Sequence, residues 1–273
     1  NHTIEGMCKL DTLVVQDIFM TETAWYADII LPASAHAEKN GTFTNTNRQV
    51  QMGRKVINPP GEAKEDLEII NDLGKALGLD WNYNHASEVF NEMSKVMPSL
   101  NNISWERVEK EDSVTYPCDD KNLPGNEIVF SQNFPTSSGL AKIVPTDLIS
   151  PHELPDQNFP FVLTTGRLLE HWHTGAMTRR SSTLDNIEPE AIVNMNRLDM
   201  KSLKLEPGNK VQVKTRRGSI ELSVRQDTEL PKGMIFIPFC FSEAAANKLT
   251  NPQLDPFGKI PEFKYCAANI EAC

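Results

Sequence analysis

The chain has 273 residues, enough for one large domain or two domains of ordinary size. Hydrophobic residues make up 39% of it, with 14 Gly and 18 Pro, which excludes collagen-like and low-complexity material and disfavours a disordered chain. The formal net charge of −10 disfavours DNA, RNA and anionic membranes as partners. A phosphate-bearing ligand would therefore need a local cluster of basic side chains.

No segment predicts a membrane span or a signal peptide. The longest apolar run, residues 234–241, is far shorter than the ~20 residues that cross a bilayer. The chain starts without Met, and its first residues are neither basic nor followed by an apolar stretch, so we expect a piece of a longer protein. An odd number of cysteines without a CxxC pair disfavours a zinc ribbon, an iron–sulfur site or a disulfide framework here. It fits a reducing compartment such as the cytoplasm.

The first residues predict a small parallel α/β unit. Residues 13–15 form a short β-branched strand, residues 21–27 suit one short helix, and residues 28–32 suit a second apolar strand. Two strands joined by a helical crossover indicate a parallel sheet, whose strands are usually buried.

A helix is predicted over residues 63–77, after a polar, loop-like stretch over 33–61. Its apolar face repeats at helical spacing, and Gly78 is placed to end it. The residues of that face are Ala63, Leu67, Ile70 and Leu77.

A second helix is predicted after Ser87, taken as its N-cap. Residues 99–158 are rich in Asn, Pro, Ser and Asp, with only short strand candidates at 128–130 and 142–144. We expect the boundary between two domains near residues 135–155.

The remaining residues change character and predict a small, closed or partly closed β-barrel. Turn signals separate short strands at Pro207-Gly208 and Arg217-Gly218, and apolar and polar residues alternate in two of the strands. One short helix is expected at 196–204, with Asn196 as N-cap. The strand candidates are residues 161–165, 191–194, 210–216, 219–225, 234–238 and 264–270.

The densest group of functional side chains spans residues 164–180, directly after the first of these strands. Glycines that allow close approach, arginine forks and threonine hydroxyls together suit a bound phosphate, and Glu170 is the only acidic residue in the group. The same residues also fit an ordinary solvated loop. His171 and His173 alone are a weak metal site, because no Cys, Asp or third His lies nearby.

Several other residues have both a structural and a functional interpretation. Lys39 and Lys264 suit a phosphate contact or an ordinary surface position, and Phe239 suits the core or a substrate wall. Asp17 lies at a strand end, where a carboxylate either receives ligand donors or caps the next helix. The sequence has no P-loop, GxGxxG or HExxH pattern and no ordered Ser–His–Asp set, so no self-sufficient catalytic site is predicted.

Seven segments, spread over nearly the whole chain, form a specific pattern through their order and spacing. They are VVQDIFMTETA at 14–24, ADIILPA at 27–33, EKNGTFTN at 38–45, NRQVQ at 47–51, the loop at 165–180, NKLT at 247–250 and EFKYCA at 262–267. Together they resemble the molybdopterin oxidoreductase family. The resemblance is nearest to the alpha, catalytic, subunit of formate dehydrogenases and next to nitrate reductases.

This resemblance implies an α/β fold followed by a mainly β fold. Residues 1–150 would form a partial, Rossmann-like α/β domain with a linker, and residues 151–273 a double-psi β-barrel that binds a molybdopterin dinucleotide. The family carries bis(molybdopterin guanine dinucleotide) with molybdenum or tungsten, and its N-terminal region binds iron–sulfur clusters.

The resemblance also transfers cofactor contacts to positions of this chain. The positions that grip one guanine nucleotide are Gln16, Asp17, Lys39 and Asp66. The loop along the pterin and pyrophosphate comprises Thr165, Gly166, Arg167, Leu168, Leu169, Glu170, His171, Trp172, His173 and Thr174. Asn247 and Lys264 match late cofactor contacts, and Phe239 matches a position that borders the substrate funnel.

The family's metal-ligating cysteine or selenocysteine and its catalytic histidine and arginine come before these segments. No catalytic residue or metal ligand is therefore assigned, and the chain alone is expected to be inactive. The leading hypothesis is the C-terminal part of a formate dehydrogenase, with formate as substrate and electrons leaving through iron–sulfur clusters. The alternatives are the same part of a nitrate reductase, or a non-catalytic molybdopterin-binding module.

The expected partners are the N-terminal domains of the same subunit and separate electron-transfer subunits. Without those domains, apolar side chains at 13–15 and 29–31 should remain exposed. The isolated chain should then associate with itself and should not retain the cofactor tightly.

Overall fold

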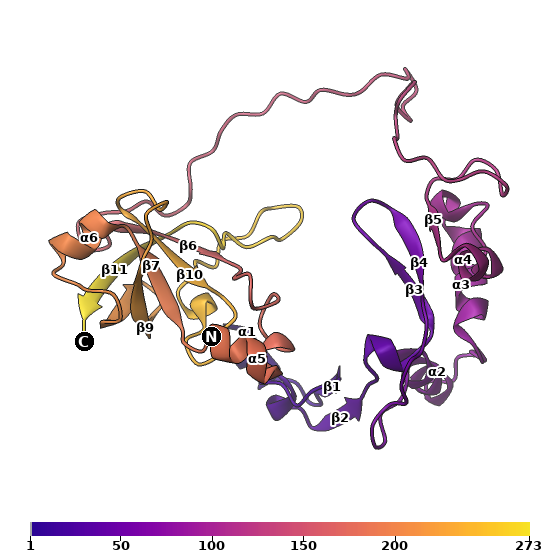
Figure 1. The fold of residues 1–273 in the computed structure, drawn as a ribbon, viewed down its shortest axis with the longest axis horizontal. Coiled ribbons are helices and arrows are strands. Elements are labelled where there is room, and N and C mark those ends of the chain that lie inside the picture. Colours follow the sequence, from indigo (N-terminus) through magenta and orange to yellow (C-terminus); the bar gives the residue numbers. More distant parts are fainter. Residues whose placement is uncertain (1) are drawn as a thin grey trace. The chain divides into compact units, whose positions relative to one another are not determined.

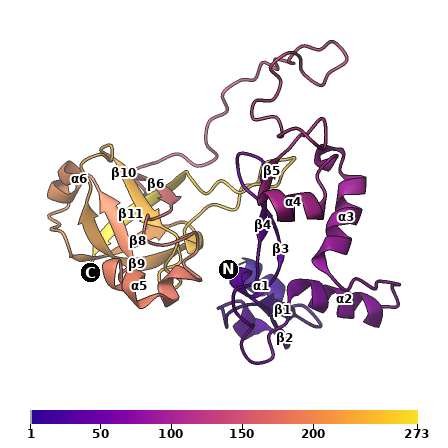
Figure 2. The same cartoon turned by 45° about the vertical axis from the view of Figure 1, so that its right-hand side comes forward.

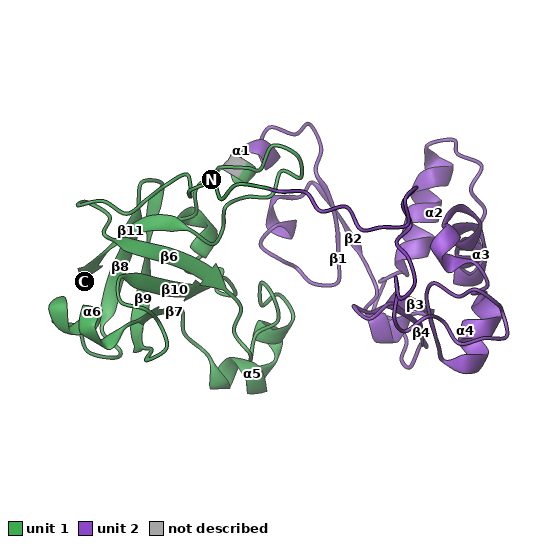
Figure 3. Ribbon diagram, turned by 90° about the horizontal axis from the view of Figure 1, so that it is seen from above, with its two compact units in different colours: residues 1–5, 146–273 green, residues 6–145 purple. Residues whose placement is uncertain are grey.

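The computed structural model describes residues 2–273. The chain divides into two compact units, one of residues 1–5 with 146–273 and one of residues 6–145 (Figure 3). Helix α1, His2–Met7, begins the described chain. No helix of residues 2–273 has the length and apolar character that a membrane crossing requires.

The C-terminal part of the chain contains a closed barrel with the strand order β10-β6-β11-β8-β9-β7 (Figure 1). Its strands are β6 Phe161–Gly166, β7 Ile192–Met195, β8 Lys210–Thr215, β9 Gly218–Gln226, β10 Met234–Pro238 and β11 Cys266–Ala272. Strand β6 pairs with β10 and β7 with β9 in parallel, while the other pairs are antiparallel. The predicted closed barrel of double-psi type is confirmed, and closure leaves no open sheet edge.

Alternate residues of these strands form the barrel core. Leu163, Val193, Val213 and Ile235 are 0% exposed. Burying one such side chain contributes roughly 1.5–3 kcal/mol. The alternation of apolar and polar residues predicted for β8 and β9 is confirmed, because the inward-facing residues of both strands are buried.

Local signals in the barrel are mostly confirmed. Helix α6, Arg197–Ser202, begins after Asn196, whose side chain accepts a hydrogen bond from the Leu198 N–H at 2.8 Å. The predicted turn at Arg217-Gly218 is displaced by one residue, because Gly218 already pairs with Thr215 at the start of β9. Three short helices were not predicted, namely η4 Thr178–Arg180, α5 Ser182–Ile187 and η5 Ala246–Lys248.

The other unit begins with strands β1, Val14–Asp17, and β2, Ile29–Pro32, which pair in parallel as predicted (Figure 2). A single 3₁₀ turn, η1 Ala24–Tyr26, forms the connection. The expectation that these strands are buried is wrong for this chain, because Val14 is 47% and Ile29 49% exposed. The exposed apolar residues expected here are present.

Residues 33–61, predicted as loops, contain most of an antiparallel sheet. Its strands are β3 Gly41–Thr44, β4 Gln49–Gly53 and β5 Ser113–Thr115, with β4 in the middle, and η2 His36–Glu38 precedes them. Threonines and glutamines in β3 and β4 make the alternation of apolar and polar residues hard to recognise in the sequence. Val50 of β4 pairs with Val114 of β5, which is distant in the sequence. The strand candidates at 128–130 and 142–144 are wrong, since neither range is a strand.

Helix α2, Asp66–Ala76, is shorter than predicted and exposes part of its expected apolar face. Ile70 is 48% and Leu77 79% exposed, and Ala63 precedes the helix. The buried residues are instead Ile69, Asn71 and Gly74, and the lack of a side chain at Gly74 lets the Trp81 ring pack against the helix. Gly78, with φ of 80°, follows the helix end as predicted.

Helix α3, Ala86–Val96, starts one residue before Ser87. The predicted N-cap is therefore wrong, because His85 Nδ1 accepts the Ser87 N–H at 3.2 Å. Turn η3, Pro98–Leu100, and helix α4, Trp105–Glu111, follow; α4 was not predicted. Trp105 and Val108 of α4 pack with α3 and the three-stranded sheet in a second small core.

Candidate functional site

Three of the predicted residues from the unit of residues 6–145 meet at one point. Gln16 lies in β1, Lys39 follows η2, and Asp66 is the first residue of α2. The Gln16 side-chain amide donates to Asp66 Oδ1 at 2.6 Å, and the Lys39 ammonium forms an ion pair with Asp66 Oδ2. The end of a strand and the start of a helix thus place an amide, an ammonium and a carboxylate together.

The Asp66 carboxylate is held in its ionised form. Burial favours the neutral acid, but hydrogen bonds from Lys39 and Gln16 outweigh it and lower the pKa of Asp66 below its usual value. Lys39 also donates to the Ser34 carbonyl at 3.2 Å, which fixes its ammonium group. An ionised carboxylate accepts hydrogen bonds only, so this cluster suits a ligand with N–H donors next to an anionic group.

Asp17 is close in sequence but makes different contacts. Its Oδ1 accepts the Ile18 and Phe19 N–H groups at 2.7 and 3.2 Å, so it holds the turn directly after β1 and does not cap the next helix, η1, which begins at Ala24. Ser34 was not predicted, yet its carbonyl contacts Lys39, and its hydroxyl is buried without a hydrogen-bond partner among residues 2–273. The available signal was its place directly after β2, beside the end of β1.

The predicted loop of the barrel begins at the end of β6. The Thr165 hydroxyl donates to the Phe263 carbonyl at 3.0 Å, and the Lys264 ammonium donates to the Thr165 carbonyl at 2.5 Å. The Phe239 N–H donates to the Gly166 carbonyl at 3.1 Å. Three segments far apart in sequence therefore meet at the carboxyl end of β6.

Aromatic rings contact the basic side chains of this region. The His173 ring meets the Phe239 ring edge to face, with centroids 5.3 Å apart, and the Lys264 ammonium lies 5.9 Å from the Phe239 centroid. Arg167 lies over the Trp172 ring at 5.7 Å. Phe239 is thus a shared wall between a lysine and a histidine, not only a core residue.

His171 points away from this wall. Its Nε2 lies 2.8 Å from the Glu188 carbonyl, which can only accept, so Nε2 carries the proton. Its ring meets Phe241 edge to face, and the side chain is 1% exposed. Nδ1 is buried and has no hydrogen-bond partner in the described part of the chain.

The remaining predicted residues make fewer contacts. Leu169 is 96% exposed, Thr174 and Asn247 are also exposed, and Leu168 and Glu170 are half-buried. The structure therefore brings Thr165, Lys264 and Phe239 together with His173. It places His171 on another side of the loop.

Arg179 belongs to the predicted group at 164–180, whose arginines were expected to suit a phosphate, but sequence reasoning missed that it holds this loop. Arg179 donates to Asp185 at 2.7 Å and to both carboxylate oxygens of Glu243 at 2.9 and 3.0 Å. Its guanidinium also lies 4.7 Å from the centroid of Phe241. Gly175, with φ of 76°, passes so close that an added Cβ would lie 2.7 Å from the Cys240 carbonyl. The two acidic partners come from distant positions, which no local pattern indicates.

No cluster of three or more His, Cys, Asp or Glu residues able to hold a metal occurs within residues 2–273. All five cysteines are free thiols. Burial raises the pKa of the Cys240 thiol to about 11, so it is neutral at pH 7.

Comparisons with known proteins place both units in one family. Residues 161–267 match the model described as Molydopterin dinucleotide binding domain, and residues 1–76 match Molybdopterin oxidoreductase. The barrel thus belongs to the class of molydopterin dinucleotide-binding domains. The chain belongs to the molybdopterin oxidoreductase family, which confirms the resemblance found in the sequence.

The chain is similar to several curated proteins over almost all of its length. It is 48% identical over 272 residues to the F420-dependent formate dehydrogenase subunit alpha of Methanocaldococcus jannaschii, covering 99% of this chain and 40% of that protein. It is 34% identical over 276 residues to the assimilatory nitrate reductase catalytic subunit of Bacillus subtilis, covering 97% and 39%. The chain therefore spans about 40% of the length of these relatives.

A solved structure shares the fold. Acetylene hydratase from Pelobacter acetylenicus matches with a TM-score of 0.78 at 20% identity, over 99% of this chain and 41% of that one. At this identity the match supports the architecture alone.

Proposed function

We propose that the chain is the C-terminal, cofactor-binding part of the catalytic subunit of a formate dehydrogenase. The observation that carries the proposal is the 48% identity, over 272 residues, to a formate dehydrogenase alpha subunit. A nitrate reductase is the second candidate, because the identity to a nitrate reductase catalytic subunit is lower, at 34%.

The residues present fit a molybdopterin guanine dinucleotide. The ionised Asp66 carboxylate suits the N–H donors of guanine, and Lys39 beside it suits a phosphate. Lys264 and Arg167 supply positive charge near the end of β6. Two buried polar atoms that have no partner in the described part of the chain, Ser34 Oγ and His171 Nδ1, lie within or beside the two predicted sets of contacts. Each would gain a partner from a polar ligand.

In this proposal residues 1–150 are a partial α/β domain with a linker and residues 151–273 the dinucleotide-binding barrel. Residues 165–174, with Asn247, orient the cofactor, while Phe239 borders the path of the substrate. The bound group would be bis(molybdopterin guanine dinucleotide) with molybdenum or tungsten. When bound, it would accept the two electrons released as formate becomes CO2 and a proton.

The proposal assigns the metal ligand, the catalytic residues and the iron–sulfur clusters to other domains of a longer subunit. Electron-transfer subunits would be further partners, and the cytoplasm the compartment. Protein outside residues 1–273 would hold part of the cofactor, so the purified chain should contain little molybdenum or tungsten. Metal analysis that finds close to one metal per chain would contradict this division of the site.

Nucleotide binding by the chain itself tests the guanine assignment. Calorimetric titration with GDP should show binding that Asp66→Asn and Lys39→Gln each weaken about fivefold, the loss of roughly 1 kcal/mol. ADP presents a different pattern of donors to Asp66 and should bind more weakly than GDP. Equal affinity for GDP and ADP, or no effect of either substitution, would refute the assignment.

Activity decides between the three functional hypotheses. The longer subunit should reduce an electron-accepting dye in the presence of formate. Reduction of nitrate in place of formate oxidation would favour the second candidate. Neither activity from a subunit that contains its full metal and cofactor would favour a non-catalytic binding module.

A further inference from the structure

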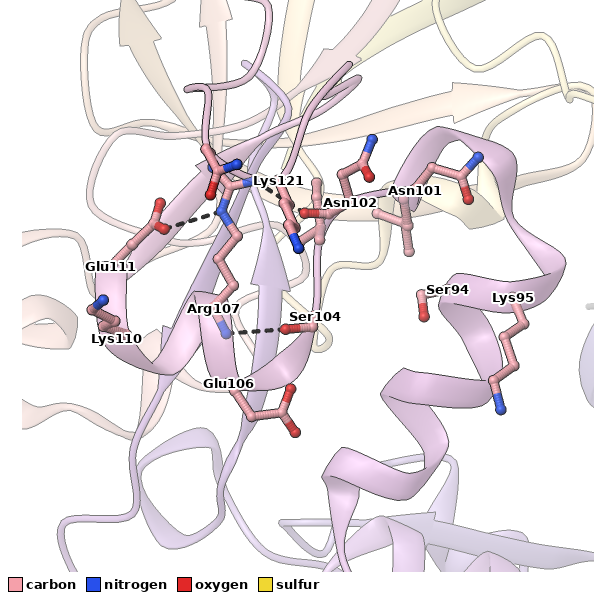
Figure 4. A pocket seen from close by; sticks show the side chains of 13 residues that line it. Ser94, Lys95, Asn101, Asn102, Ser104, Glu106, Arg107, Lys110, Glu111 and Lys121 are labelled. Atoms are coloured by element: carbon pink, nitrogen blue, oxygen red, sulfur yellow. Dashed lines mark hydrogen bonds and ion pairs between the residues drawn. The ribbon is translucent and has the colours of Figure 1, made fainter.

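A cavity of about 670 Å³ in the unit of residues 6–145 is held together by its own lining (Figure 4). Arg107 Nε donates to Glu111 at 3.1 Å, and the terminal nitrogens of Arg107 donate to two backbone carbonyls at 3.0 and 2.6 Å. The ammonium groups of Lys95 and Lys110 point away from the hollow (Figure 4). Arg107 thus serves the fold of its own unit, and these two lysines face the solvent.

The barrel unit contains a buried amide that joins two segments. Asn251 comes shortly after η5 and is 6% exposed. Its side-chain nitrogen donates to Glu262 Oε2 at 2.8 Å and to the Tyr265 carbonyl at 3.1 Å. Its Oδ1 accepts the Gln253 N–H at 3.0 Å. Both N–H donors and the oxygen of this amide therefore have partners, and all three partners lie later in the chain.

The segment that carries Asn251 is fixed to the barrel. The Leu249 carbonyl accepts hydrogen bonds from the Thr215 hydroxyl at 2.9 Å and from Arg217 Nε at 3.0 Å. Leu249 itself is 0% exposed. The Asn251 N–H donates to the Cys266 sulfur at 3.2 Å, at the start of β11. The residues after η5 are thus tied to both β8 and β11.

Two partners of the Asn251 amide lie on either side of Lys264 in the sequence. Glu262 comes two positions before it, and Tyr265 one position after it. Lys264 in turn donates to the Thr165 carbonyl at 2.5 Å, at the end of β6, where the predicted cofactor loop begins. Asn251 therefore holds both ends of the short stretch that carries this ammonium group.

An asparagine side chain suits these contacts. Its two N–H donors face the Glu262 carboxylate and the Tyr265 carbonyl, which accept, and its oxygen faces a backbone N–H. Aspartate would set a second carboxylate against Glu262. Alanine would leave the Tyr265 carbonyl and the Gln253 N–H without these bonds, in a place where little water can replace them.

We propose that Asn251 is a positioning residue, which fixes the Lys264 ammonium group relative to η5, the element that carries Asn247. Lys264 and Asn247 are both predicted cofactor contacts, so the consequence for binding rests on the proposed function. Asn251 would act through residues 262–265 and not by contact with the cofactor. Without it, Lys264 would remain charged but less well placed, and ordering it on the cofactor would cost affinity.

Retention of the cofactor by the longer subunit tests the inference. After dialysis, the subunit with Asn251→Ala should have lost pterin about tenfold faster than the unaltered subunit, because buried hydrogen bonds on both sides of Lys264 are removed. Fluorescence of the oxidised pterin measures this loss without reference to any enzymatic activity.

The matched control is Asn196→Ala. It makes the same chemical change in the same barrel and removes the side-chain bonds to the Leu198 N–H and the Leu230 carbonyl. Neither partner is a predicted cofactor contact, so retention should change less than about twofold.

A double-mutant cycle shows whether Asn251 acts through Lys264. In a subunit that already carries Lys264→Gln, Asn251→Ala should accelerate the loss of cofactor less than about threefold, whereas a purely structural residue would have the same effect in both backgrounds. Asn251→Ser, which keeps a hydroxyl for the Gln253 N–H, is the milder variant and should show the same dependence on Lys264. In the 273-residue chain, Asn251→Ala should also speed amide exchange at residues 262–266, which Asn196→Ala should leave unchanged.

Three results would overturn the inference. They are equal retention by Asn251→Ala and Asn196→Ala, an equal effect of the Asn251 variants with and without Lys264→Gln, and unchanged exchange at residues 262–266. Any of these in a subunit that oxidises formate would contradict the positioning role alone. A subunit that loses its cofactor as expected in Asn251→Ala but does not oxidise formate would support the positioning role and contradict only the proposed function.

Discussion

The barrel and the β1–β2 sheet differ in how completely they bury their apolar side chains. Six strands close on themselves in the barrel, and the residues at its centre, such as Leu163 and Val213, are 0% exposed. The β1–β2 sheet has two strands, and Val14, Ile29 and Ile30 are 47%, 49% and 39% exposed. A two-stranded sheet is marginal in water on its own.

The contrast shows which residues rest on a support that is complete within the chain and which rest on a sheet that could still pair with further strands. The barrel pairs the backbone hydrogen-bonding groups of its strands and buries its own core. Its loop at 165–174 therefore rests on a rigid support. The cluster of Gln16, Lys39 and Asp66 rests on a sheet that is open to additional strands. We expect the barrel contacts to survive in isolation better than the cluster does.

The largest expected effect comes from the barrel core. Leu163→Ala removes a fully buried side chain from β6 and should lower the free energy of unfolding of the barrel by about 2–5 kcal/mol. Val14→Ala, on the half-exposed strand β1, should cost less than about 1 kcal/mol. Hydrogen exchange resolved by peptide measures both units in one sample. Similar costs at the two positions would remove the distinction drawn between them.

Gly175 is expected to give the next largest effect. Gly175→Ala places a Cβ 2.6 Å from Arg179 and 2.7 Å from the Cys240 carbonyl, at a φ of 76°. Gly208→Ala is a matched control, because Gly208 has φ of 87° but open space around its position. Both substitutions should lower the stability by about 1–2 kcal/mol, because alanine is unfavourable in the left-handed backbone conformation. Only Gly175→Ala adds a steric clash. Denaturant unfolding should show Gly175→Ala to be clearly less stable.

The barrel could be predicted well because each of its elements has a recognisable pattern within its own short segment of the sequence. Each of its strands is apolar or alternating, and Asn196 signals α6 directly. The sheet of β3, β4 and β5 was missed because its strands are short and polar, so neither the strand of Val50 nor that of Val114 stands out in the sequence. Strand propensity depends on the neighbours that a strand packs against, and these are not visible in a short polar segment.

The candidate site was predictable to a similar extent. The resemblance supplied Lys39, Asp66 and Lys264, which do make close polar contacts within their own units. It could not indicate that His171 uses Nε2 on the Glu188 carbonyl, or that Arg179 and Glu243 hold the loop. Those contacts depend on how distant segments pack. The binding roles themselves remain predictions.

A smaller effect is expected from the charge of Asp66. Its folded-state pKa lies below the usual 3.8, so its ionised form stabilises the folded chain above pH 3.8. That contribution should fall as the pH drops from 3.8 through the lower folded pKa. Asp66→Asn should remove this part of the pH dependence, whereas Asp80→Asn, at an exposed position, should retain it. Unfolding by urea between pH 2.5 and 6 compares the variants, and identical profiles would contradict the role of the Lys39 ion pair.

The smallest effect should be weak self-association through the open sheet. The exposed apolar residues of β1 and β2 favour contact with a second copy, because strand edges pair and apolar surface is removed from water. Ile29→Lys and Ile30→Lys should shift the chain towards monomer in light scattering at high concentration. Ile143→Lys, at a site 91% exposed outside any strand, is the matched control and should change association much less. If the unaltered chain is monomeric over a wide concentration range, the exposure of β1 and β2 has no consequence for association, and the contrast with the barrel is one of stability alone.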